Sequence, residues 1–327
     1  MDKPIPTREA YGRTLEEMAR NELYSDIVVL DADLSCSTKT EYFALQNPAK
    51  FFQMGISEQD MICTAVGLAL SGKIPFVSTF AIFGSRAWEQ IRNSIARMNL
   101  PVRLCFSHGG ISVGEDGSSA QANEDVSIMR SIPNMKVFIP SDAIETKRII
   151  YYLAEHRVGP AYVRLTRNAV PLLSHPCEHF IPGKGELLKF GNDGTFIACG
   201  QMVALALKTA EKLTESGYSV RVINMASIKP IDSELIIKAC KETGFIITLE
   251  EHSIIGGLGS AVCEVSAEHH PAKVHRIGIN DVFGVSGSPK ELFEKYKFTE
   301  NDIIHAYFAL KENPASQTTQ HASKASP

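Results

Sequence analysis

Glu58 is a carboxylate at the start of an apolar stretch, a position from which it could do chemistry. It follows Ser57 and stands shortly before the apolar run 62–70. Ser57 and Asp60 have the spacing of a capping box, which places Glu58 in the first turn of a buried helix. The helix dipole alone favours a carboxylate there, so a chemical role for Glu58 depends on its neighbours.

Two aromatic residues and a histidine follow predicted strands further along the chain. Phe80 and Phe83 come after the predicted strand 74–78, and His108 opens a glycine-rich loop after the predicted strand 102–106. A phenylalanine pair alone more often belongs to a core, whereas loops of this kind more often carry function. The carboxyl ends of parallel strands meet at one edge of a sheet, where ligands bind. These side chains therefore predict a ligand site at the strand ends.

The elements that must position these residues alternate between short apolar strands and amphipathic helices. This βαβ order predicts a mainly parallel sheet with helices on both faces. A proline-containing connection interrupts the order, and a second α/β unit follows. The predicted strands are 27–30, 74–78, 102–106, 136–139 and 161–165 in the first unit, and 196–198, 219–223, 245–249 and 274–277 in the second. The predicted helices include 84–97, 202–216 and 233–241.

We therefore predict an α/β fold of two consecutive three-layer domains with mainly parallel sheets. The first domain is expected over residues 1–170, a linker over 171–190 and the second domain over 191–310. Residues 311–327 are polar and poor in apolar side chains. Such a segment cannot bury enough surface to offset the entropy of ordering, so we expect a disordered tail.

The composition limits the classes of partner. The chain is 44% hydrophobic and 21% charged, with a formal net charge of −4 and no basic stripe for nucleic acid or a membrane surface. No apolar run reaches the length of about 18 residues that spans a bilayer, and the first residues do not resemble a signal peptide. We expect a cytoplasmic protein whose partners are small molecules or proteins. Seven widely spaced cysteines without a CxxC pair predict reduced thiols.

Three of these segments, taken in order, resemble the pyrimidine-binding domain of the transketolase family. They are 55–58, similar to the family's Gly-Ile-x-Glu, then Thr79-Phe80 with Phe83, and His108 with the Gly-Glu-Asp-Gly sequence at 114–117. The resemblance runs from about residue 7 to residue 310, and the second unit resembles the transketolase C-terminal domain. We interpret the chain as the C-terminal subunit of a split transketolase.

Members of this family use thiamine diphosphate, and the resemblance assigns part of its binding site to this chain. Glu58 is implied to be catalytic, through a hydrogen bond to a ring nitrogen of the cofactor's aminopyrimidine. Phe80 and Phe83 are implied to form the aromatic wall against which the pyrimidine stacks. Arg86 stands where many relatives carry tyrosine, and Asp33 is expected near the cofactor.

The resemblance also nominates side chains for the substrate. The anionic group of a sugar phosphate is implied to be bound by Arg8, Ser37, His108 and Arg167. Guanidinium groups suit this role because they pair with oxyanions through two hydrogen bonds. His108 is implied to be catalytic as well, and Asp116 is expected to contact a substrate hydroxyl.

Two parts of the family pattern are absent from this sequence. Ala120 replaces a histidine that contacts the donor sugar in many relatives, which leaves the donor open. The Gly-Asp-Gly motif that holds the cofactor's diphosphate through Mg²⁺ does not occur, so no metal ligand is expected in this chain. The resemblance implies a partner, an N-terminal transketolase subunit that supplies the diphosphate and Mg²⁺ site in an α2β2 assembly.

The implied reaction transfers a two-carbon glycolaldehyde unit from a ketose phosphate, or a related anionic ketose, to an aldose phosphate. One alternative is a subunit similar to 1-deoxy-D-xylulose-5-phosphate synthase or to the β subunit of 2-oxoacid dehydrogenases. Another is a non-catalytic scaffold of the same fold. Arg8, Ser37 and His108 favour sugar phosphates over 2-oxoacids, and the presence of Glu58 disfavours the scaffold.

Overall fold

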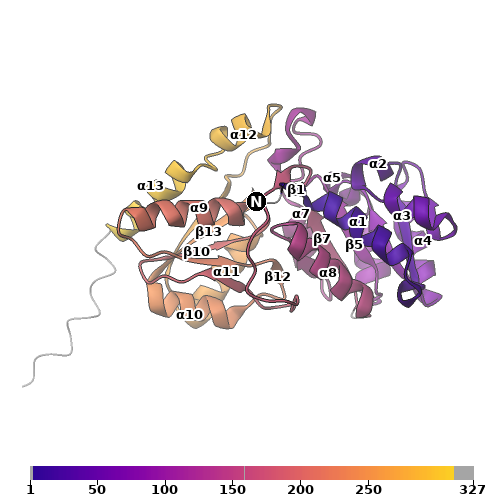
Figure 1. The fold of residues 1–327 in the computed structure, drawn as a ribbon, viewed down its shortest axis with the longest axis horizontal. Helices are drawn as coiled ribbons and strands as arrows, with labels where there is room; N and C mark the ends of the chain where they lie inside the picture. Colours follow the sequence, from indigo (N-terminus) through magenta and orange to yellow (C-terminus); the bar gives the residue numbers. More distant parts are fainter. Residues whose placement is uncertain (1–2, 158, 313–327) are drawn as a thin grey trace, which may run out of the picture.

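The computed structural model describes residues 3–157 and 159–312, which form two α/β domains lying beside each other (Figure 1). Each domain has a mainly parallel sheet with helices on both faces, so the predicted fold class is confirmed. Within the described ranges, no helix is long and apolar enough to span a bilayer. The tail predicted at 311–327 falls largely outside the described residues, but Lys311 still belongs to the last helix.

The first domain contains a seven-stranded sheet in the order β12-β6-β7-β5-β4-β2-β3. Neighbouring strands are parallel except β12, which pairs antiparallel with β6. Its strands are β2 (Ile27–Asp31), β3 (Phe51–Gln53), β4 (Ile74–Ser78), β5 (Arg103–Ser107), β6 (Lys136–Phe138), β7 (Ala161–Leu165) and β12 (Ser227–Lys229). Because β12 comes from the second half of the chain, the sheet joins the two domains.

Alternate side chains of each central strand pack against opposite helical layers. In β2, Val28 and Leu30 contact one layer, and Ile27 and Val29 contact the other. Strands that are buried on both faces read as continuous apolar runs, which is why the sequence reveals them. One face is covered by α1 (Thr7–Ala19) and α8 (Ala143–Glu155), and the other by α4 (Glu58–Leu70), α7 (Asp125–Ser131) and the segment 81–96. Two short helices, α2 (Ser35–Thr38) and α3 (Glu41–Gln46), follow β2.

The second domain has a five-stranded sheet in the order β14-β13-β10-β11-β9, with only β9 antiparallel. Its strands are β9 (Glu186–Lys189), β10 (Thr195–Ala198), β11 (Arg221–Asn224), β13 (Phe245–Ser253) and β14 (Lys273–Ile279). The helices are α9 (Met202–Glu215), α10 (Ser233–Thr243), α11 (Leu258–His269), α12 (Pro289–Lys295) and α13 (Glu300–Lys311). Strand β9 lies in the stretch expected to be a linker. A separate two-stranded ladder pairs β1 (Ile5–Pro6) with β8 (Ala169–Val170).

Three local predictions near the site were wrong. The helix predicted at 84–97 is broken into α5 (Ala81–Gly84), a 3-10 turn at 85–87, α6 (Trp88–Gln90) and a π-helical segment at 91–96. Ser57 precedes α4 without a side-chain capping bond, and its own N–H donates to the Gly55 carbonyl in a tight turn. Helix α4 is not fully buried either, since Cys63, Gly67 and Leu70 are exposed.

Candidate functional site

Four neighbouring strands of the first sheet bring predicted site residues to one edge. Strands β7, β5, β4 and β2 are adjacent and parallel, so their carboxyl ends lie together. Asp33 follows β2, Phe80 follows β4, His108 follows β5 and Arg167 follows β7. Beyond the ladder, Phe80 forms a further parallel bridge with Ser107, which keeps the two chain segments side by side.

Glu58 is a buried carboxylate that accepts no hydrogen bond from the described chain. It is the first residue of α4 and only 4% exposed. The Arg86 Nε atom lies 3.6 Å from Glu58 Oε2, beyond a hydrogen bond, and the Arg86 side chain is 70% exposed. Gln59 Nε2 donates to the Arg86 carbonyl at 3.1 Å, which ties the start of α4 to that segment. Buried polar groups are normally hydrogen-bonded, so Glu58 is available to a donor from outside the described chain.

Phe80 is stacked with two neighbouring rings. Its ring centroid is 5.4 Å from that of Phe83, with 10° between the planes. The His108 ring lies on it at 3.6 Å and 19°. The neighbouring Thr79 hydroxyl is buried and has no hydrogen-bond partner within the described ranges. Stacked aromatic surface next to an unused polar atom suits the binding of a flat, polar ring.

His108 is a neutral ring held from both sides. Its backbone has a left-handed φ of 60°, its Nδ1 atom lies 2.8 Å from Ser107 Oγ, and its Nε2 atom lies 3.3 Å from Arg8 Nη1. A guanidinium only donates, so Nε2 accepts and the ring proton lies on Nδ1. Burial, helped by the charges of the nearby Arg8 and Arg167, lowers the pKa of His108 to about 3. His108 can therefore accept or position a proton without carrying charge at neutral pH.

Arg8 and Arg167 lie near the two ends of the first domain's sequence, and these ends pair with each other through β1 and β8. Arg8 Nη1 also donates to the Ser37 carbonyl at 2.8 Å, whereas Arg8 Nε is buried without a partner among the described residues. Arg167 Nη1 lies 3.2 Å from Asp116 Oδ1. Burial and the charge of Arg167 lower the pKa of Arg8. Two cations that disfavour each other are stabilised by an anion placed between them.

Two predicted site residues, Ser37 and Asp33, make their hydrogen bonds to other described residues through the main chain and not through their side chains. Ser37 faces Arg8 with its carbonyl, and Asp33 is exposed, with its N–H donating to Gln53 Oε1 at 2.7 Å. The buried acid of this region is Asp31, which sequence reasoning did not single out. It accepts hydrogen bonds from the Leu34 N–H and from the Thr38 and Thr40 hydroxyls. The signal was an aspartate at a strand end shortly before two threonines.

Sequence reasoning also missed side chains of the second domain that reach this edge. Glu251, on β13, and Gln201, just before α9, both bond Ser112 in the loop after His108. The available signal was that polar residues follow the predicted strands 196–198 and 245–249 within three positions. That pattern does not say which element such residues meet.

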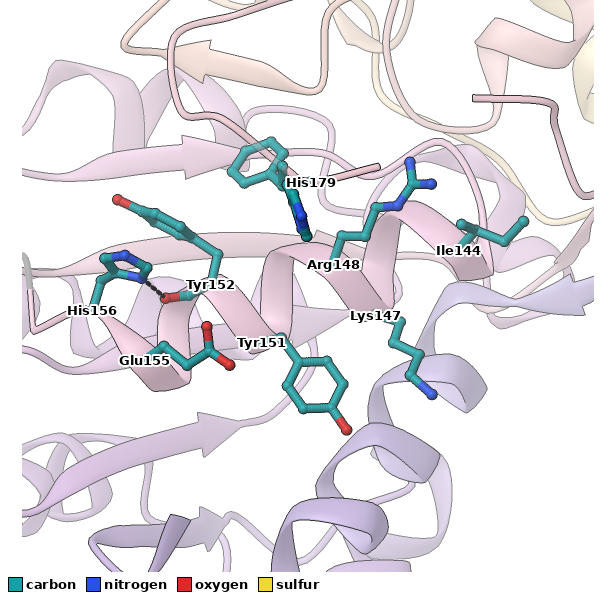
Figure 2. A pocket seen from close by; sticks show the side chains of 9 residues that line it. Ile144, Lys147, Arg148, Tyr151, Tyr152, Glu155, His156 and His179 are labelled. Atoms are coloured by element: carbon teal, nitrogen blue, oxygen red, sulfur yellow. Dashed lines mark hydrogen bonds between the residues drawn. The ribbon is translucent and has the colours of Figure 1, made fainter. Parts of the chain in front are cut away.

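A separate groove of about 550 Å³ lies on the outer surface of α8, away from these residues (Figure 2). Tyr151, Tyr152 and His156 line it together with the segment around Phe180. Its lysine and arginine are already paired, since Lys147 Nζ lies 2.8 Å from Glu17 Oε2 and Arg148 Nη1 lies 3.9 Å from Glu186 Oε1. None of the predicted site residues lines this groove, so the size of a cavity does not locate the candidate site.

Comparisons with known proteins agree with the geometry. Residues 3–171 match the model of the transketolase pyrimidine binding domain, and residues 183–303 match that of the transketolase C-terminal domain. A putative transketolase C-terminal section from Methanocaldococcus jannaschii is 50% identical over 88% of this chain and 91% of that protein. A 6-deoxy-6-sulfo-D-fructose transketolase subunit from a Clostridium species is 37% identical over 93% of this chain and 94% of that protein.

A solved structure has the same fold along nearly the whole chain. It is described as a split gene transketolase in an inactive beta4 tetramer, with a TM-score of 0.86 and 47% sequence identity. The match covers 95% of this chain and 99% of that chain. On the two family models, these relatives and this shared fold, the chain belongs to the transketolase family and contains its pyrimidine-binding and C-terminal domains.

Proposed function

We propose that this chain is the C-terminal subunit of a two-subunit transketolase. The assembled enzyme transfers a two-carbon glycolaldehyde unit from an anionic ketose, such as a ketose phosphate, to an aldose phosphate. One observation carries the proposal. A buried carboxylate without hydrogen bonds in the described chain, Glu58, belongs to the same domain edge as a stacked pair of phenyl rings and two arginines around a neutral histidine.

The residues present fit the aminopyrimidine end of thiamine diphosphate. Glu58 offers a free buried acceptor for a ring N–H, and Phe80 with Phe83 offers a flat apolar surface. We assign Arg86 the task of orienting the Glu58 carboxylate, and Asp33 a place beside the cofactor after β2. When bound, thiamine diphosphate supplies an electron sink that allows the carbon–carbon bond next to a ketose carbonyl to break. The carboxylate of Glu58 holds the proton on the pyrimidine ring nitrogen.

The substrate's anionic group is assigned to the cluster of Arg8, His108 and Arg167, together with Ser37. Arg8 has a buried Nε atom that no described residue contacts by a hydrogen bond, and its pKa is lowered by burial and by Arg167, so an added anion relieves both costs. Asp116 is held 3.2 Å from Arg167, which places an acceptor for a sugar hydroxyl next to the anion site. His108 is assigned a catalytic part as a neutral ring that receives or holds a proton of the substrate.

A partner chain is the second half of the proposal. The Clostridium relative is described as a subunit, and the Methanocaldococcus relative as a C-terminal section. We propose that an N-terminal transketolase subunit supplies the groups that hold the diphosphate and Mg²⁺, in an α2β2 assembly. The description of the related split-gene structure as an inactive beta4 tetramer is consistent with a need for such a partner.

The test is a donor and acceptor assay on the two purified chains mixed with thiamine diphosphate and Mg²⁺. We expect transfer of glycolaldehyde units from ketose phosphates to aldose phosphates. Pyruvate is the control donor, because its use in place of a ketose would identify a deoxyxylulose-phosphate synthase or a 2-oxoacid dehydrogenase activity. No turnover with either donor class, in a complex that binds the cofactor, would support the scaffold.

A further inference from the structure

The glycine-rich loop after His108 is held by the second domain. Ser112 N–H donates to Glu251 Oε1 at 2.6 Å. Gln201 Nε2 donates to Glu251 Oε2, and also to Ser112 Oγ at 2.9 Å. Glu251 is only 4% exposed, so these bonds are made away from solvent, where a charge-assisted bond is strong. The main chain four residues after His108 is therefore fixed by a carboxylate from another domain.

The loop packs closely against the Glu251 carboxylate at Gly110. Gly110 has a φ of +85°, and a Cβ atom there would lie 2.4 Å from Glu251 Oε1. The Gly110 N–H also donates to the Ala122 carbonyl at 2.7 Å, which closes the loop on itself. Arg164 then links the loop end to the same strand, donating to the carbonyls of Ala122 at 3.1 Å and Glu251 at 3.0 Å. Both ends of the loop are thus tied to the position of Glu251.

Residues 285–286 of the second domain hold the rest of the loop. Gln121 Nε2 donates to the Val285 carbonyl at 3.0 Å and to the Ile111 carbonyl at 3.3 Å. Ser286 Oγ donates to the Glu115 carbonyl at 2.7 Å. The segment that carries Asp116 is therefore fixed between its own domain and the second domain.

We propose that Glu251 is a positioning residue for anion recognition at the first-domain edge. It does not touch the substrate site but fixes the loop that sets the places of His108 and Asp116. This network gives the second domain a part in substrate binding. The step from loop position to substrate affinity rests on the proposed function, whereas the loop position itself does not.

The matched control for Glu251 is Glu250, its neighbour on β13. Glu250 is also a buried glutamate, but it accepts from the N–H groups of Leu258 and Gly259 at the start of α11. Both changes to alanine remove a buried, hydrogen-bonded carboxylate from the same strand. Only the change at Glu251 frees the loop after His108.

The experiment compares Glu251→Ala, Glu251→Gln and Glu250→Ala in the assembled two-chain complex. In Glu251→Ala we expect faster amide hydrogen exchange over 110–117 and a roughly tenfold higher KM for the sugar phosphate, the size of one lost charge-assisted bond. The KM for thiamine diphosphate is expected to stay unchanged. Glu251→Gln keeps one acceptor for Ser112 and should be intermediate, and it serves for measurement if the alanine variant does not fold. Glu250→Ala should leave the exchange over 110–117 and the KM unchanged.

Unchanged exchange over 110–117 in the Glu251 variants, or equal effects in the Glu250 control, would overturn the inference. Hydrogen exchange decides the loop's dependence on Glu251 without any turnover. Absence of sugar-phosphate turnover in the wild-type complex would instead count against the proposed function. Faster exchange with an unchanged KM would refute the link between the loop and substrate binding.

Discussion

Two buried carboxylates, one in each domain, differ in the hydrogen bonds that their oxygens accept. Glu58, at the start of α4, is 4% exposed and has no hydrogen bond from the described chain, while Glu250, on β13, is 1% exposed and accepts two main-chain N–H groups. Burial alone therefore does not separate a binding carboxylate from a structural one. The hydrogen bonds of the carboxylate oxygens separate the two roles. A carboxylate that accepts none from the protein can accept one from a ligand, whereas a carboxylate that already accepts them stabilises the fold.

The largest expected effect follows from Glu58→Gln in the assembled enzyme. The amide cannot hold a shared proton on the cofactor's ring nitrogen as a carboxylate does, so kcat should fall by about 100-fold or more. The free energy of unfolding should change little, because Glu58 makes no hydrogen bond within the described chain and its ion-pair partner Arg86 is 70% exposed. Steady-state kinetics and urea denaturation of the same preparation measure the two quantities.

Glu250→Ala should show the opposite behaviour. It removes the acceptor for two N–H groups at the start of α11, so the free energy of unfolding should fall by about 2 kcal/mol. Turnover by the remaining folded enzyme should be unchanged. If Glu250→Ala lowered kcat as strongly as Glu58→Gln, the contrast between the two carboxylates would be lost.

Arg8→Met tests the anion site at the first-domain edge. Its guanidinium contacts the Ser37 carbonyl and His108, and its Nε atom has no partner in the described chain. Loss of one charge-assisted contact should raise KM for a sugar phosphate by roughly tenfold. A neutral sugar donor should be affected much less, and equal effects on the two donors would show that Arg8 does not recognise the anion.

A smaller effect is expected in the pH dependence of stability. Burial raises the pKa of Glu250 from 4.5 to about 7, although two N–H groups oppose the shift. A carboxyl whose folded pKa is raised stabilises the fold fully below its unfolded pKa, and that contribution is lost as pH rises through the folded pKa. The melting temperature should therefore fall between about pH 4.5 and pH 7 through this group. Glu250→Gln should flatten the curve, and an unaltered slope would contradict the assignment.

Much of the site edge could be predicted from sequence because its signals are local. Strands buried on both faces read as apolar runs, and Phe80, His108 and Arg167 each follow one directly. Glu58 is the first residue of α4, and the apolar residues that follow it in the sequence predicted this helix.

The unpredicted features depend on contacts between segments far apart in the chain. Strand β12 joins the first sheet from the second half, and Glu251 meets Ser112 across 139 positions of sequence. Gly84, where α5 ends, likewise packs so closely on Phe106 that a Cβ atom would lie 2.2 Å from its ring. No periodicity in either partner alone reveals such a contact.

The most direct test of the central claim measures glycolaldehyde transfer in four mixtures with thiamine diphosphate and Mg²⁺. The mixtures are this chain alone, the N-terminal partner alone, both chains, and both chains with Glu58→Gln in this one. The account predicts transfer only with both wild-type chains. Transfer by this chain alone, or an undiminished rate with Glu58→Gln, would contradict it.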